Sequence, residues 1–333
     1  MPYPVIILGA GASYEYIHDQ DVYQSKRHYR PPLTKQLFSP RIREIAKGII
    51  AEYPRIIKLF GELNSALRAG KDFEDYLLEV RDRSLERKKQ IISFQYYLHD
   101  LFQLISKNYG GQVGNNYEIL VERIKESFDE ACFVTFNYDT LLEQSLFAEK
   151  NVSDIRTYIS SPHKLIKVHG SCDWVYSTPS NVRERILDEG VYKVLIDNPD
   201  LAEIINSHKG ITVETQHSDD YPAIAIPIAG KDESDFVCPT EHTNKLIEAL
   251  SKTDRIILVG WAARDPALIQ LIKEHVNCPA DMYLVCGATT RTIDAIRKRF
   301  NDVSLITIKE TRDNAFTFSD FLNSRDCDAF MSE

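Results

Sequence analysis

The sequence predicts an α/β protein built on a doubly wound, parallel, Rossmann-like sheet that carries a helical insertion. Short aliphatic runs alternate along the chain with longer stretches of helical periodicity, which is typical of parallel strands joined by helices. The first run, residues 5–8, is wholly aliphatic, as expected of a strand buried on both faces. Four of the runs end in glycine or polar residues, and ligands of such sheets bind beyond the carboxyl ends of the strands.

The first strand leads into a turn that contains Gly9 and Gly11. Two glycines allow a tight bend that brings backbone N–H groups and the start of the next helix toward a pyrophosphate, and Ser13 adds a hydroxyl donor there. Tyr14 stands where the usual dinucleotide fingerprint has its third glycine, so the motif by itself is weak. Residues 19–32, with two prolines and few aliphatic side chains, are predicted to form a loop placed like a lid over this turn.

Residues 34–130 have a helical pattern. Phe73, Tyr76, Leu77 and Val80, for example, follow the spacing of one helix face. About a hundred residues are too many for one crossover between two strands, so we expect a helical insertion subdomain beside the sheet. Its aromatic stripes are predicted to be core.

The rest of the chain completes the predicted sheet. Further strands are expected at residues 131–136, 165–168, 223–229, 256–259, 283–286 and 303–308, and a helix at residues 292–300. Residues 177–218 carry no clear pattern. The predicted domains are therefore a Rossmann-like domain of residues 1–33 and 131–320, the helical insertion of residues 34–130, and a C-terminal tail of residues 321–333.

Composition excludes several classes of function. The chain has 333 residues and a formal net charge of −9, and such an acidic surface argues against non-specific binding to nucleic acid. Its six cysteines stand singly without a Cys-x-x-Cys pair, which argues against structural zinc and fits a reducing compartment. No apolar run is long enough for a signal peptide or a membrane-spanning helix, so we expect a cytoplasmic protein.

The polar strand ends predict the site. They read Gly9-Ala10-Gly11-Ala12-Ser13, Asn137-Tyr138-Asp139, His169-Gly170-Ser171, and Gly260 through Trp261 to Asp265. Each of them alone is commonly a turn, a helix cap or a structural histidine, and Asp265 followed by Pro266 is typical of a helix start. Four such ends in one predicted sheet indicate a ligand site.

Taken together, these residues resemble the sirtuin family, and more specifically the sirtuin-like NADases of bacterial antiphage defence. The resemblance covers residues 1–34 and 131–310. It implies that NAD⁺ is the substrate, that Asn137 faces the nicotinamide ribose and that His169 is the catalytic base. The residues that it implies in binding NAD⁺ are Gly9, Ala10, Gly11, Ser13, Asp139, Gly170, Ser171, Gly260 and Trp261.

The chain departs from the sirtuin deacylases at three places. It lacks their two Cys-x-x-Cys pairs, so no zinc is expected. Their Gly-Thr-Ser turn is replaced by Gly260, Trp261 and Ala262, which removes a hydroxyl contact to the cofactor. Their Asp-Phe-Arg loop motif is also absent.

The resemblance makes an NAD⁺ glycohydrolase the first hypothesis, with nicotinamide and ADP-ribose as products. Cleavage of the bond between nicotinamide and ribose passes through an oxocarbenium-like state, in which Asn137 can orient water and His169 can accept its proton. An NAD-dependent protein deacylase and a non-catalytic regulatory subunit that binds NAD or ADP-ribose are the alternatives.

An NADase that is always active would deplete its own host of NAD⁺, so we expect control by a partner. The resembling systems suggest a HerA-type ATPase, a short Argonaute or another phage sensor, within a homo- or hetero-oligomer. The predicted contact surfaces are residues 34–130 and 177–218, because neither is needed to complete the sheet.

Overall fold

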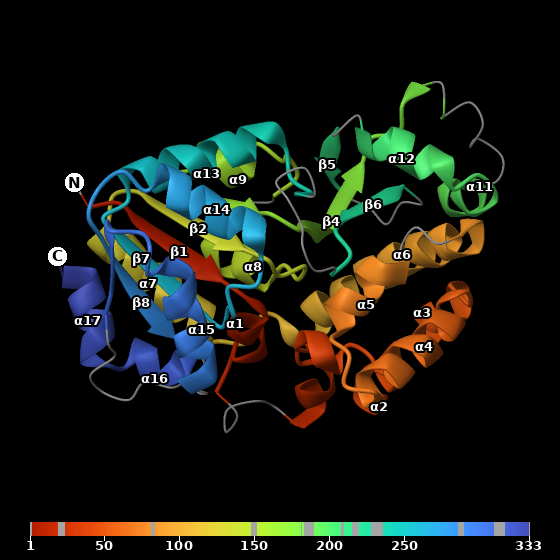
Figure 1. Ribbon diagram of the computed structural model, residues 1–333, viewed down its shortest axis with the longest axis horizontal. Helices are drawn as coiled ribbons and strands as arrows, with labels where there is room; N and C mark the ends of the chain where they lie inside the picture. Colours follow the sequence, from red (N-terminus) through yellow and green to blue (C-terminus); the bar gives the residue numbers. More distant parts are fainter. Residues whose placement is uncertain are drawn as a thin grey trace.

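The structure is a computed structural model that describes residues 2–18, 24–80, 84–147, 152–180, 182, 190–207, 210–214, 220–227, 236–285, 290–309 and 317–332. Two parts lie side by side. The larger contains the central sheet and both chain ends, and the smaller contains a second sheet and most of the helices drawn in orange and green (Figure 1).

The central sheet has six strands in the order β3-β2-β1-β7-β8-β9, and every neighbouring pair is parallel. The predicted doubly wound parallel sheet is therefore confirmed. The strands are β1 (Pro4–Leu8), β2 (Ala131–Thr135), β3 (His163–Lys167), β7 (Arg255–Val259), β8 (Ala280–Val285) and β9 (Ile306–Ile308). The strand order reverses between β1 and β7, which makes the carboxyl ends of these two strands the topological switch point.

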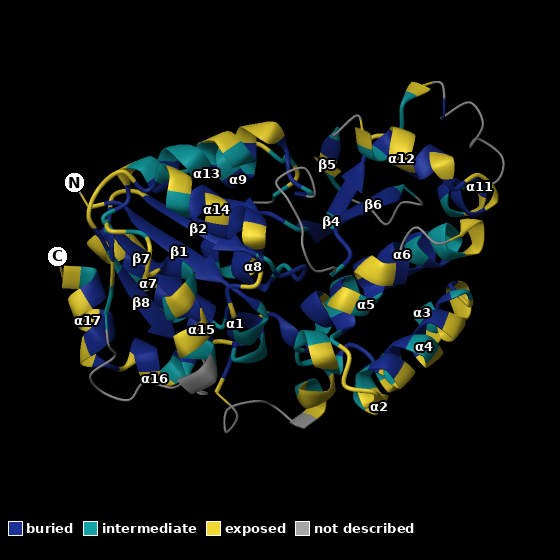
Figure 2. Cartoon of the chain, viewed as in Figure 1, coloured by how far each residue is buried: buried dark blue, intermediate teal, exposed yellow. Residues whose placement is uncertain are grey.

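Strand β1 lies at the centre because it is apolar on both faces. All five of its residues are buried, and Leu8 pairs with Thr135 of β2 on one side and with Val259 of β7 on the other. The three strands consequently end at the same level. Figure 2 shows these central strands in the colour of buried residues.

Helices cover both faces of the sheet. On one face α13 (Thr240–Lys252) packs against α14 (Pro266–His275), and on the other α7 (Asn116–Ser127) packs against α16 (Phe318–Leu322) and α17 (Arg325–Ser332) (Figure 1). The expected C-terminal tail is thus mostly helical and attached to the sheet. Phe330 of α17 is buried, and its ring contacts Phe128 and Tyr283. Shorter helices of this part are α1 (Ala10–Tyr14), α8 (Leu141–Leu146) and α9 (Thr157–Ser160), and α15 (Thr290–Phe300) connects β8 to β9.

The second part is built around an antiparallel sheet in the order β5-β4-β6. Its strands are β4 (Gly170–Tyr176), β5 (Ile211–Val213) and β6 (Tyr221–Ile224), and the long helix α6 (Leu85–Tyr109) packs along β4 and β6. Around them lie α2 (Pro40–Ile45), α3 (Lys47–Glu52), α4 (Ile56–Arg68), α5 (Phe73–Val80), α11 (Val191–Asp197) and α12 (Asp200–Ser207). Helices of residues 34–109 therefore pack with residues 170–224, whereas α7 belongs with the central sheet. The domain boundaries drawn from the sequence stay a prediction.

The strand expected at residues 223–229 does not belong to the central sheet, so this prediction is wrong. Residues 221–224 form β6 of the second sheet and run antiparallel to β4, and residues 228 and 229 lie outside the described residues. The physical reason is Gly170, which pairs with Ile224 at a φ of +78° and has no side chain to keep the backbone of Ala223 away. The apolar pattern indicated a strand but carried no information on its partner.

The segment expected as a loop at residues 19–32 is partly helical. Residues 24–29 form the 3₁₀ helix η1 (Gln24–Tyr29), and η2 (Thr34–Gln36) follows, while residues 19–23 lie outside the described residues. Lys26 of η1 donates a hydrogen bond to the carbonyl of Gly110 at 2.9 Å. The unplaced stretch 177–218 contains α11, α12 and β5 among its described residues.

A buried histidine joins the second sheet to α6. The Nδ1 atom of His99 lies 2.9 Å from Asp100 Oδ1, and its Nε2 atom lies 3.3 Å from Oε2 of Glu214, which follows β5. Burial lowers the pKa of His99, but the hydrogen bonds and charges of the two carboxylates outweigh burial and raise the pKa to about 9. His99 is therefore a charged link at neutral pH.

We expect this link to stabilise the fold in a pH-dependent way. A folded-state pKa of about 9, above the ordinary 6.5, gives a contribution that is complete below pH 6.5 and lost as the pH rises through 9. The difference in free energy of unfolding between the wild type and His99→Gln should shrink by about 3 kcal/mol from pH 6 to pH 9.5, measured by urea denaturation. An equal difference at both pH values would contradict the charged link.

Candidate functional site

Four polar strand ends come together at one edge of the central sheet. Strands β3, β2, β1 and β7 are consecutive neighbours, so the segments that follow them lie side by side. These are the four segments that the sequence analysis singled out. Their neighbourhood follows from the strand order, which the sequence did not reveal.

The glycine turn after β1 packs directly on the turn after β7. Gly9 N–H donates to the Val259 carbonyl at 2.9 Å, and Gly11 N–H donates to the Gly260 carbonyl at 3.1 Å. A Cβ on Gly9 would lie 2.5 Å from the Gly260 oxygen, and one on Gly11 would lie 2.7 Å from the Gly260 Cα. The backbone packing of the protein therefore requires both glycines, whether or not a ligand binds there. Ala10 and Gly11 keep part of their surface exposed, whereas Gly9 is buried.

Asn137 is held by a buried hydrogen-bond network. Its Nδ2 atom donates to the Gly9 carbonyl at 2.9 Å and to Ser13 Oγ at 2.8 Å, and it lies 3.3 Å from the Tyr117 hydroxyl. Ser13 Oγ in turn lies 2.9 Å from the Tyr117 hydroxyl and donates to Asp139 Oδ1 at 3.1 Å. Ser13 therefore fixes Asn137 and Asp139 in place, and its expected hydrogen bond to a pyrophosphate stays a prediction.

Asp139 sits above a buried ionic cluster. Burial raises the pKa of Asp139, although Lys167 and Ser13 partly offset this effect. The Lys167 ammonium is wholly buried and donates to the Asp139 carbonyl and to Glu143 Oε1, both at 2.6 Å. Burial also raises the pKa of Glu143 to about 7. One lysine thus anchors the backbone that carries Asp139.

His169 forms a pair with Asp265. Its Nε2 atom lies 2.9 Å from Asp265 Oδ2, while Oδ1 of the same carboxylate accepts a hydrogen bond from Leu268 N–H at 2.9 Å. The predicted helix cap at Asp265 is therefore present, and this residue also orients the histidine. An aspartate held in this way can stabilise an imidazolium.

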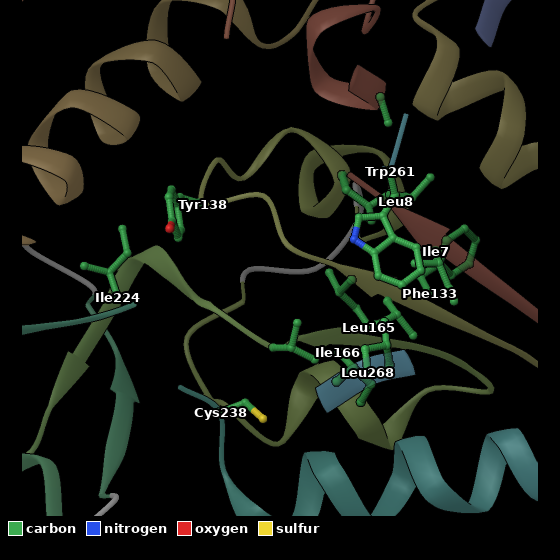
Figure 3. Packing of buried hydrophobic residues seen from close by; sticks show 14 of the residues in the cluster. Ile7, Leu8, Phe133, Tyr138, Leu165, Ile166, Ile224, Cys238, Trp261 and Leu268 are labelled. Carbon is green, nitrogen blue, oxygen red and sulfur yellow. The ribbon is translucent and has the colours of Figure 1, made fainter. Parts of the chain in front are cut away.

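Aromatic rings lie next to His169 and the turn after β7. The Phe136 ring stacks on Trp261 with 5.0 Å between centroids and packs edge-on against His169 at the same separation. In Figure 3 the Trp261 indole lies toward Ile7 and Phe133, which belong to the same apolar cluster. Ala262 is exposed next to it and carries no hydroxyl.

Gly170 and Ser171 are not part of this cluster. They begin β4, where Gly170 permits the close approach of β6. The Ser171 side chain is fully buried, and its hydroxyl lies 3.5 Å from the Tyr138 carbonyl. Their assigned contact with a ligand stays a prediction.

Three residues of the site were missed by sequence reasoning. Tyr117 stood in an apolar helical stripe that indicated only core, and Lys167 lay inside a predicted strand without any signal. Asp265 was recognised as a cap, and its position in the same loop as Trp261 was the one available indication of a second role. Within the described ranges no group of three His, Cys, Asp or Glu side chains could hold a metal ion, and no helix is long and apolar enough to cross a membrane.

No family model and no curated protein matches the chain. Solved structures of Sir2 enzymes are among those that match the chain. One, described as the structural basis for the mechanism and regulation of Sir2 enzymes, is 13% identical over 96% of this chain and 90% of that chain, with a TM-score of 0.41. A Sir2 homologue in complex with NAD is 13% identical over 99% and 91%, with a TM-score of 0.38. Sir2Tm bound to a propionylated peptide is 13% identical over 99% and 94%, with a TM-score of 0.40.

The packed glycine turns make a prediction about stability. Gly11→Ala forces a Cβ against the backbone of Gly260, so we expect it to lower the free energy of unfolding by about 1–3 kcal/mol. Gly61→Ala in α4 is the matched control, because nothing lies within 4 Å of its added Cβ. That change should stabilise the protein by about 0.5–1 kcal/mol. Urea denaturation of both variants measures the contrast, and equal stability of the two would rule out the close packing.

Proposed function

We propose that the chain is an NAD⁺ glycohydrolase that cleaves NAD⁺ into nicotinamide and ADP-ribose. The observation that carries the proposal is the strand order β3-β2-β1-β7, which brings His169, Asn137 and the glycine turn to one edge of the sheet. That edge includes the switch point, where dinucleotides bind in open α/β sheets. The resemblance of the four strand-end motifs to sirtuin-like NADases supports the same reaction.

Asn137 has the chemistry to position water or a ribose hydroxyl. Its Nδ2 atom is engaged with Gly9 and Ser13, which fixes the plane of the amide. No described residue donates a hydrogen bond to its Oδ1 atom, so this acceptor is available to a ligand. A fixed acceptor beside the anomeric carbon would hold the attacking water without the cost of ordering a side chain.

His169 is the proposed general base. A proton on Nε2 that is shared with Asp265 puts the lone pair on Nδ1, and we assign the proton transfer to this nitrogen. Water loses a proton to His169 as its oxygen bonds to the anomeric carbon, and the bond to nicotinamide breaks. Nicotinamide leaves as a neutral molecule, so no strong acid is needed. Asp265 then balances the charge of the imidazolium.

The biological part of the proposal is antiphage defence through depletion of NAD⁺, under the control of a partner protein. This part rests on the resemblance to the sirtuin-like NADases of antiphage defence. It also rests on the argument that an NADase that is always active would deplete its own host of NAD⁺. A non-catalytic subunit that binds NAD or ADP-ribose is the second candidate, and Ala262 favours it because the hydroxyl expected at this position is missing.

The decisive experiment is to incubate the purified chain with NAD⁺ and to follow the release of nicotinamide. Release by the chain alone, or after addition of a candidate partner, supports the glycohydrolase. Binding of NAD⁺ by calorimetry without release in either condition favours the regulatory subunit. Release that requires an acetylated peptide would instead identify a deacylase.

Replacing the side chains of Asn137 and His169 should abolish the cleavage of NAD⁺. Asn137→Ala and His169→Ala should each reduce nicotinamide release by about 10²–10⁴-fold, the usual contribution of a general base or a comparable positioning group. Asn323→Ala and His275→Ala are matched controls outside the site, since Asn323 is exposed and His275 ends α14. A folded Asn137 or His169 variant with near-wild-type turnover would overturn the assigned role.

Asp265 should act as a positioning residue through His169. Asp265→Asn keeps an oxygen to cap α14 but removes the negative charge beside Nε2. We expect turnover to fall at least about tenfold and the acidic limb of the pH–rate profile to move to lower pH, because a neutral amide stabilises an imidazolium less than a carboxylate does. An unshifted profile would mean that Asp265 only caps the helix.

A further inference from the structure

A lysine is completely buried beneath the proposed site. Lys167 is the last residue of β3, and its ammonium donates to the Asp139 carbonyl and to Glu143 Oε1, both at 2.6 Å. Burial lowers the pKa of Lys167, but the neighbouring carboxylates, chiefly that of Glu143, outweigh burial and raise it. A buried charge costs free energy that an apolar side chain in the same strand would not cost. The charge at this position therefore calls for an explanation other than packing.

Glu143 accounts for only part of the charge of Lys167. Burial raises the pKa of Glu143 to about 7, and the charge of Asp173 adds to this effect, although Lys167 opposes it. The Oε2 atom of Glu143 is buried and has no hydrogen-bond partner among the described residues. An oxygen without a donor favours the neutral acid over the carboxylate. Glu143 therefore carries a proton in a large share of the molecules at neutral pH, and the charge of Lys167 is left for another carboxylate.

Asp139 is the carboxylate that Lys167 can balance. Burial raises the pKa of Asp139, while the charge of Lys167 and the hydrogen bonds from Ser13 and from Leu141 N–H lower it. Both of these hydrogen bonds reach Oδ1, and no described residue donates to Oδ2. The other titratable groups that interact with Asp139 all have a pKa raised by burial and are uncharged at neutral pH; they are Tyr16, Tyr117 and Cys172.

The charge of Asp139 fixes the direction of the hydrogen bonds above it. Ser13 has a single hydroxyl proton, and a charged carboxylate can only accept, so Ser13 donates to Asp139. Ser13 Oγ must then accept hydrogen bonds from the Tyr117 hydroxyl and from Asn137 Nδ2. Asn137 consequently keeps its Oδ1 atom turned away from Ser13, which is the orientation that the Gly9 carbonyl also favours. The state of one carboxyl group thus orients the amide to which we assign the attacking water.

We propose that Lys167 is a positioning residue whose charge keeps Asp139 ionised and thereby orients Asn137 for the cleavage of NAD⁺. This inference rests on the proposed function, because it assigns a role in that reaction. A charged carboxylate in the site would also offset the positive charge that develops on the ribose ring. The side chain of Lys167 has no exposed surface, so it acts through Asp139 and not by contact with a ligand.

The first test is a titration of Asp139 in the full chain by carbon-13 NMR of the aspartate carboxyl groups, with Asp139→Asn to identify its signal. Lys167→Met should raise the midpoint of this titration by about one pH unit or more, because a nearby opposite charge is removed. Lys164→Met is the matched control, since Lys164 lies on the same strand near the Tyr3 ring, and it should leave the midpoint unchanged. An unchanged midpoint in Lys167→Met would overturn the proposal.

The second test is the release of nicotinamide by the same variants. Lys167→Met should lower turnover about tenfold or more, because an uncharged Asp139 no longer orients the network. Glu143→Gln should change turnover less than about threefold, because its amide oxygen still accepts a hydrogen bond from Lys167. A purely structural ion pair predicts equal losses in the two variants, and that result would refute the positioning role.

Two further outcomes are distinguishable. Lys167→Gln keeps a donor for the Asp139 carbonyl and replaces Lys167→Met if the latter does not fold. If neither variant folds, the wild type decides, because an uncharged Asp139 at neutral pH contradicts the proposal and a charged one supports it. A wild type that releases no nicotinamide under any condition refutes the proposed function, whereas the titration of Asp139 still shows whether Lys167 holds its charge.

Discussion

The close backbone contact between the turns after β1 and β7 is the constraint on which the rest of the structure depends. Gly11 N–H reaches the Gly260 carbonyl only because neither turn carries a side chain at the point of contact. This contact sets the position of the Gly9 carbonyl, to which Asn137 is bonded, and of Trp261, which stacks on Phe136. The two turns thus organise the polar and the aromatic side of the site.

The polar side chains around Asn137 are buried, and Ser13, Asn137, Asp139 and Lys167 each form hydrogen bonds that compensate for the loss of water. Ser13 bridges Asn137 and Asp139, while Lys167 fixes the backbone below them. A buried polar group without such a partner would cost about 1–3 kcal/mol. The network is therefore a rigid support, and the catalytic role proposed for Asn137 needs that rigidity because a misplaced water would not reach the anomeric carbon.

The second sheet shows how a single turn redirects the chain. Strand β3 ends at the edge of the central sheet, His169 follows it, and Gly170 then allows β4 to start in another direction against β6. The histidine is consequently fixed from both sides, by β3 and by the second sheet. His99 in turn joins that second sheet to α6.

The sequence by itself determined the parallel sheet, the strand ends that carry polar residues, and the helical nature of residues 34–130, because apolar periodicity and glycine turns are local properties. It did not determine that residues 221–224 pair with β4, since an apolar run has no built-in partner. Only the tertiary structure brought Tyr117 to Ser13 and Asp265 to His169, which are separated by about a hundred residues. Such contacts arise from the packing of whole elements, and packing is decided by shape and burial across the complete fold.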